Sequence, residues 1–177
     1  MAHRCVVVTL VSLVAVLTAS SLDAQSTNLH SGAGVVVPVG EFSDYTSPGW
    51  MVFAGANRQI GDNPLLSWDA TAFFGSVSHD DYEGDATQIP GFGVGGRYGA
   101  GAGVTRPYGG AMVGLLQHRY VSDTFEESSE TKPFVAIGGG VQGRVGSAAL
   151  FADTRIVLAS STSFLSIMGG FTFGVAR

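Results

Sequence analysis

The chain has 177 residues, and only 13% of them are charged, about half the share of a typical soluble domain. Its 26 glycines and its net charge of −5 accompany a hydrophobic fraction of 45%. This composition excludes a disordered chain and is unusual for an ordinary soluble domain.

The first 24 residues have the order of a secretory signal peptide. Arg4 gives a positive start, an apolar run extends over Val6–Leu17, and small and polar residues follow up to Ala24. The run is shorter than the roughly 20 residues that a membrane-spanning helix needs. We expect cleavage after Ala24, with a nearby site such as Ser21 as the alternative, and one domain over residues 25–177.

The only cysteine, Cys5, lies inside this signal, so we expect no disulfide in the mature domain. After the signal there is no second long apolar stretch, which excludes a helical membrane protein. Few charges, many glycines and no helical span are typical of a transmembrane β-barrel, in which apolar residues face outward and small or polar residues face inward.

Residues 25–177 divide into eight segments in which apolar residues recur at every second position, with turn-forming residues between them. Most are about 9–11 residues long, the length at which a tilted strand crosses a bilayer. In chain order they are Leu29–Val37, Trp50–Ile60, Leu65–Gly75, Ile89–Tyr98, Tyr108–His118, Phe134–Arg144, Ala149–Leu158 and Phe164–Val175. The sequence predicts an all-β fold, an eight-stranded antiparallel up-and-down transmembrane β-barrel after a cleaved signal peptide.

The alternation also indicates which side chains point into the barrel. Gly91, Gly93 and Gly95 keep a period of two within one strand, which loop flexibility does not explain. An eight-stranded barrel is just wide enough for side chains to fill it, so we place these glycines inward and expect the inward set to be mostly small or polar.

Acidic residues are sorted by connector. In an antiparallel barrel the first, third and fifth connectors meet at one end, and here they are Pro38–Gly49, Ser76–Gln88 and Arg119–Lys132. They hold ten acidic residues, namely Glu41, Asp44, Asp80, Asp81, Glu83, Asp85, Asp123, Glu126, Glu127 and Glu130. The even connectors and the carboxyl end carry Arg58, Arg97, Arg106, Arg144 and Arg177. Because long loops of such barrels are extracellular, we expect the acidic end outside and both termini in the periplasm.

A further pattern is the order of short motifs along residues 27–177. These are Gly32–Val35, Pro38–Gly40, Gly49-Trp50, Arg106–Tyr108, Lys132–Gly140 and the closing strand. In this order they resemble the outer-membrane β-barrel family of small porin-like proteins typified by OmpX and the membrane domain of OmpA. The resemblance implies that Gly170, Phe173 and Val175 form a carboxyl-terminal assembly signal that the barrel insertion machinery reads, although two further residues follow it here.

No arrangement of hydroxyl, imidazole and carboxylate groups indicates an enzyme. His30 and Ser31 are neighbours in a strand and therefore point to opposite faces, and the His-x-Ser pair of lipid A deacylases is absent. No ligand spacing resembles a structural metal site. We expect no catalysis and no cofactor. For the acidic loops two interpretations stay open: a solvated surface, or weak binding of divalent cations between the loops and lipopolysaccharide.

Four charged residues are assigned to the inside of the barrel: Asp69, Arg97, Asp153 and Arg155. Charges inside a narrow barrel must be paired or hydrated. We expect a polar network that closes the lumen, and the alternative is a ring of charges that lines a conducting pore.

The sequence therefore predicts an outer-membrane barrel with a structural or surface-interaction role. We expect a monomer whose partners are outer-membrane lipid, lipopolysaccharide, the insertion machinery and an extracellular partner of the loops, but no nucleic acid. The alternatives are a narrow passive pore and a soluble periplasmic ligand-binding barrel of lipocalin type. A soluble barrel needs charges on its outward face, and none stands at Leu66, Phe74, Ile137, Ile156 or Phe171.

Overall fold

The computed structural model describes residues 27–79, 84–100, 104–122 and 128–174. The expected signal peptide and Val175 lie outside these ranges. In chain order the elements are β1 (Thr27–Pro38), the 3-10 helix η1 (Gly40–Asp44), β2 (Gly49–Ile60), β3 (Asn63–Ser78), β4 (Ala86–Gly99), β5 (Thr105–Val121), β6 (Ser128–Val145), β7 (Ala148–Ala159) and β8 (Phe164–Phe173). In the described part of the chain, no helix has both the length and the apolar character needed to cross a membrane.

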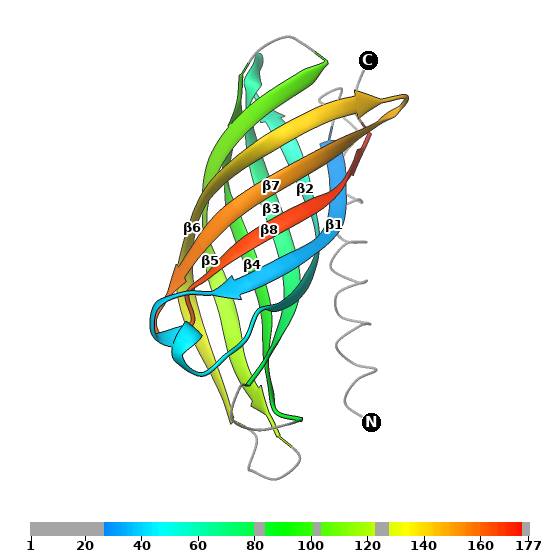
Figure 1. Cartoon of the computed structure of the whole chain (residues 1–177). Helices are drawn as coiled ribbons and strands as arrows, with labels where there is room; N and C mark the ends of the chain where they lie inside the picture. Colours follow the sequence, from blue (N-terminus) through cyan, green and yellow to red (C-terminus); the bar gives the residue numbers. More distant parts are fainter. Residues whose placement is uncertain (1–26, 80–83, 101–103, 123–127, 175–177) are drawn as a thin grey trace, which may run out of the picture.

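Each strand pairs antiparallel with the next, and β8 closes on β1, so the sheet is a closed barrel (Figure 1). The closing ladder sets Val35 opposite Ile167 and Leu29 opposite Phe173. Closure leaves no edge strand to pair with another chain. The predicted eight-stranded antiparallel up-and-down barrel is confirmed.

The barrel has two unlike ends (Figure 1). One end, which we call the loop end, carries η1 and the connectors that follow β1, β3, β5 and β7. The other, the turn end, carries the short turns Gly61-Asp62 and Gly146-Ser147. Thr27 and Phe173, where the first and last strands begin and end, also lie at the turn end.

Strands β3, β4, β5 and β6 are longer than the sequence indicated. The ladder continues to Ser78↔Ala86 between β3 and β4, and to Tyr120↔Ser128 between β5 and β6. The predicted third and fifth connectors were therefore too long, and Glu130 lies in β6. Polar residues near the loop end hide the apolar alternation, while backbone pairing continues without it.

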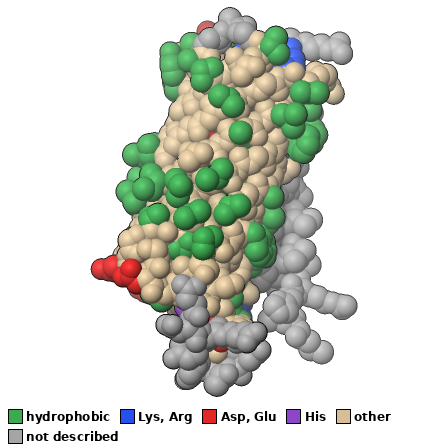
Figure 2. Space-filling view, viewed as in Figure 1, with side chains coloured by type: hydrophobic (Ala, Val, Ile, Leu, Met, Phe, Trp, Pro, Cys, Tyr) green, Lys and Arg blue, Asp and Glu red, His purple; other side chains and the backbone are tan. Residues whose placement is uncertain are grey.

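Strand alternation divides the side chains as predicted. Ile137, Ile156 and Phe171 are exposed on the outside, whereas Asp69 and Asp153 are buried inside. Figure 2 shows hydrophobic side chains spread over the barrel wall, with a cluster of acidic side chains at the loop end, and with a basic cluster and a further acidic side chain at the turn end.

Candidate functional site in the barrel lumen

The lumen near the loop end is filled by apolar side chains, which we call the apolar core. Its members are Val36, Phe42, Met51, Phe53, Phe73, Val77, Ile89, Met112, Leu116, Phe134, Ala136, Val157, Phe164 and Met168. This finding corrects the expectation of a mostly small or polar inward face. Phe42 enters from η1 and is fully buried, so the 3-10 helix supplies an apolar side chain at the mouth of the barrel.

The inward glycines make room for the rings of this core. A Cβ added at Gly91 would lie 2.3 Å from Cζ of Phe73, and one added at Gly93 would lie 2.8 Å from Cζ of Phe134. The two rings themselves meet nearly edge to face, with centroids 5.7 Å apart. The period-two glycines thus complement large residues on neighbouring and nearby strands, since a narrow barrel cannot hold bulk at every inward position.

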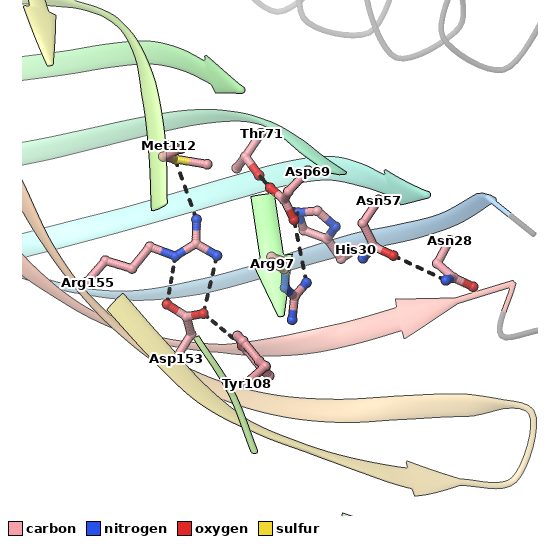
Figure 3. A network of polar contacts seen from close by, with 10 residues as sticks. All are labelled: Asn28, His30, Asn57, Asp69, Thr71, Arg97, Tyr108, Met112, Asp153 and Arg155. Atoms are coloured by element: carbon pink, nitrogen blue, oxygen red, sulfur yellow. Dashed lines mark hydrogen bonds and ion pairs between the residues drawn. The ribbon is translucent and has the colours of Figure 1, made fainter. Parts of the chain in front are cut away.

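Beyond the apolar core, Asp153 is the centre of a buried set of hydrogen bonds (Figure 3). It is 3% exposed and accepts from Arg155 Nε at 2.8 Å, from Arg155 Nη2 at 3.2 Å and from the Tyr108 hydroxyl at 2.7 Å. The guanidinium approaches the carboxylate with two N–H groups, the geometry that makes such pairs strong. Arg155 Nη1 also reaches Met112 Sδ at 3.6 Å, which places the pair directly against the apolar core.

The second pair, Asp69 and Arg97, lies on β3 and β4. Arg97 Nη1 donates to Asp69 Oδ2 at 3.5 Å, and Thr71 Oγ1 donates to Asp69 Oδ1 at 2.6 Å. The guanidinium of Arg97 also lies over the Tyr108 ring, 3.9 Å from its centroid. Tyr108 therefore contacts both ion pairs and joins the four predicted residues into one group. We call these four residues, with His30, Thr71 and Tyr108, the polar network (Figure 3).

Sequence reasoning did not anticipate His30, Thr71 and Tyr108 in this network. The sequence does indicate that Thr71 and Tyr108 point inward. Thr71 is two residues from Asp69 on the same strand, and Tyr108 is an even number of residues from His118. What the sequence did not contain was the stagger between strands, which decides the neighbours that meet across the lumen.

His30, Thr71 and Asp69 bring an imidazole, a hydroxyl and a carboxylate together, yet they do not form a nucleophilic relay. His30 Nε2 lies 3.1 Å from Thr71 Oγ1 and 3.9 Å from Asp69 Oδ2, so hydroxyl and carboxylate face the same ring nitrogen. A relay needs the carboxylate on the opposite nitrogen. All three side chains are also buried, which keeps them from a substrate. Among the described residues, no group of three or more possible ligands is placed to hold a metal.

The lumen of the described chain contains cavities, of which three adjoin the polar network. Two small ones, of about 10 and 30 Å³, lie beside the polar network and the apolar core. The third, which we call the vestibule, measures about 610 Å³ and is lined by residues of the turn end. Arg97 and Tyr108 line all three cavities, so their stacked side chains form the floor of the vestibule.

A second set of contacts lies at the loop end. Lys132 Nζ donates to Ser161 Oγ at 2.7 Å, and His118 Nδ1 lies 2.8 Å from Thr162 Oγ1. Asp85, in the connector before β4, accepts a hydrogen bond from Tyr120. Hydrogen bonds from Tyr120 and then Ser122 lower the pKa of Asp85 below its usual value.

The candidate assembly signal is only partly within the described chain. Gly170 lies on the inward face of β8 and Phe173 on the outward face, where its ring stacks on Phe171 with centroids 6.2 Å apart.

A closed eight-stranded antiparallel barrel with an apolar outer wall defines the fold class of small outer-membrane barrels. No family model matches the sequence, and no curated protein matches it. Solved structures do match. Neisserial surface protein A has a TM-score of 0.65 and 14% identity, over 86% of this chain and 99% of that one.

Two further solved structures share the fold. The attachment invasion locus protein Ail of Yersinia pestis, in complex with the heparin analogue sucrose octasulfate, has a TM-score of 0.56 and 11% identity, over 84% of this chain and 99% of that one. The N-terminal β-barrel domain of Pseudomonas aeruginosa OprF has a TM-score of 0.52 and 12% identity, over 84% and 97%. This confirms the fold that the resemblance to OmpX and OmpA implied.

Proposed function

We propose that this chain is an outer-membrane β-barrel with a structural or surface-interaction role, and that its lumen is closed. The observation that carries the proposal is the outward face. Of the outward strand residues in the described chain, only Arg58 and Arg119 are charged, and each lies near a strand end. An apolar outer surface of this kind is stable in lipid, whereas exposing it to water is unfavourable in free energy.

Aromatic side chains border this wall at both ends. Trp50 and Phe74 pack together near the loop end, with ring centroids 5.7 Å apart. Tyr98, Phe171 and Phe173 are exposed near the turn end. Aromatic residues concentrate at the two interfaces of a membrane because their rings are apolar and their edges tolerate water. The two groups support a membrane-spanning band between them.

The content of the lumen supports closure over conduction. The apolar core occupies the loop-end half, and the polar network is internally paired. A conducting pore needs a continuous wet path, and apolar constrictions oppose one by dewetting. Steady single-channel current from the purified chain in a planar bilayer would overturn closure and favour a narrow pore.

A surface-interaction role is supported by the proteins that share the fold. One is named a surface protein and another an attachment invasion locus protein crystallised with a heparin analogue. In our proposal the loop end is outside and both termini are periplasmic, residues 1–24 are removed as a signal, and the barrel is inserted as a monomer by the insertion machinery. The partners remain outer-membrane lipid, lipopolysaccharide and an extracellular ligand of the loops.

Cell fractionation tests the location most directly. We expect the chain in the outer-membrane fraction, resistant to extraction by high salt and released by detergent. Recovery in the soluble periplasm would overturn the proposal and favour a ligand-binding barrel of lipocalin type.

The orientation has a matched pair of probes. Glu130 is exposed at the loop end and Asp62 at the turn end, and the only native cysteine is Cys5. In a Cys5→Ser background, Glu130→Cys should react with an impermeant maleimide on intact cells, and Asp62→Cys only after lysis. The reverse pattern would show that the loop end faces the periplasm.

A further inference from the structure

The vestibule at the turn end has the size and lining of a ligand site. Its volume of about 610 Å³ falls within the roughly 300–1,000 Å³ of small-molecule pockets. The walls come from the turn-end segments of β1 to β7, and the floor is the Arg97–Tyr108 stack. The cavity is therefore a cup that ends at the polar network.

The lining of this cup has one sign of charge. Arg97, Arg106 and Arg144 line it, and no Asp or Glu is among its lining residues, all of which belong to the described chain. Asp69 pairs with Arg97 from beneath the floor, whereas Arg106 and Arg144 are exposed near the turn-end limits of β5 and β6. Guanidinium groups recognise phosphate and carboxylate groups through paired N–H donors.

Neutral polar groups complete the lining. Asn57, Gln59 and Gln142 add side-chain amides, and Ser67 adds a hydroxyl. Amides donate and accept hydrogen bonds at the same time, as a ligand with several hydroxyl groups requires. Tyr108 provides an aromatic surface on β5, against which the C–H face of a sugar ring can pack.

We propose that the vestibule binds a small polyhydroxylated anion, a saccharide that bears a phosphate or a carboxylate group. Arg106 and Arg144 take the anionic group, and the amides take the hydroxyls. This site adds a ligand to the proposed function. It rests on that proposal only for its location on the periplasmic side. A closed floor means that the ligand is held at this end and is not conducted.

The test is a titration of the folded chain in detergent micelles, followed through its backbone amide resonances. The probes are glucose 1-phosphate, glucuronate and, as the uncharged reference, glucose. We expect saturable shifts for one or both anions, concentrated on the vestibule walls around Tyr108 and Gln142, and none for glucose. Saturation by only one of the two anions would identify which acidic group the site takes.

Two sets of variants distinguish specific binding in the vestibule from non-specific attraction of anions to positive charge. Arg106→Gln with Arg144→Gln should weaken binding at least tenfold. Arg58→Gln is the matched control, because Arg58 lies at the same end of the barrel on the outward face of β2 and does not line the cup. It should bind like the unmodified chain.

Three results would overturn this inference: no saturable shift for either anion, equal shifts for glucose, or an equal loss with Arg58→Gln. None of them depends on where the barrel resides in the cell. Failure here therefore leaves the outer-membrane proposal intact, and a soluble location would leave the site intact.

Discussion

The narrow interior of the barrel is filled differently in its two halves. From the loop end to the middle, inward positions carry large apolar side chains that meet glycines on neighbouring and nearby strands. From Asp69 and Asp153 toward the turn end, they carry paired charges, amides and an open cup. The first half is stabilised by packing and the second by ion pairs and hydrogen bonds between polar groups. Alternation alone does not distinguish them, because both halves keep the same inward phase.

The largest effect is expected in the apolar half. Phe73 is buried against Phe134 and Phe164, so Phe73→Ala should destabilise the barrel by about 3–5 kcal/mol, the usual cost of such a cavity. The measurement is urea unfolding in lipid vesicles.

Gly91→Ala supplies the control for this prediction. The three nearest atoms to its new Cβ all belong to the Phe73 ring, so it should destabilise the unmodified chain and be much better tolerated beside Phe73→Ala. Simple additivity of the two changes would contradict the packing described for this half.

A similar or slightly smaller effect is expected in the polar half. Asp153→Ala leaves Arg155 buried without its carboxylate, which costs about 3–5 kcal/mol when the site is dry. If water fills the site, the loss shrinks to about 1 kcal/mol or less, the scale of exposed pairs. Unfolding by urea gives the number, and planar-bilayer recording of the same protein gives conduction. A small loss together with steady current would show that this half is a wet pore.

The contrast between the halves assumes that both share one lipid-facing wall. Ile156→Arg places a charge on that wall and should cost about 2–4 kcal/mol near the midplane. Gln142→Arg makes the same change on the inward face, at the vestibule, and should cost less. Equal losses in vesicles would show that the assigned phase does not describe the folded protein in lipid.

The sequence predicted the barrel because backbone alternation is a local property. Every strand that alternated clearly, such as β7 and β8, appears with the expected outward set. It predicted the polar residues of the lumen for the same reason, since Asp153 and Arg155 share a face whatever surrounds them. It did not predict the apolar core or the role of Tyr108. Which inward side chains meet depends on the stagger of strands far apart in the chain, and that stagger has no local signature.

The smallest effect is expected at the mouth of the loop end, where Asp85 lies under Tyr120. Because hydrogen bonds from Tyr120 and Ser122 lower the pKa of Asp85, its ionised form is favoured by folding. The resulting stability is fully present above the unfolded pKa, about 4 for an aspartate, and is lost as the pH falls through the lower folded value.

Tyr120→Phe removes the first of these hydrogen bonds, so the variant should be slightly less stable at pH 7. The difference from the unmodified chain should disappear as the pH falls below about 4, because a protonated Asp85 no longer gains from the phenolic donor in the same way. Thermal unfolding of both proteins in micelles between pH 7 and pH 2 measures this difference in stability. If the difference in stability between the two proteins stays constant over that pH range, the charge of Asp85 does not contribute to it. Tyr120 would then stabilise the loop end through its ring, which packs edge-on against His79.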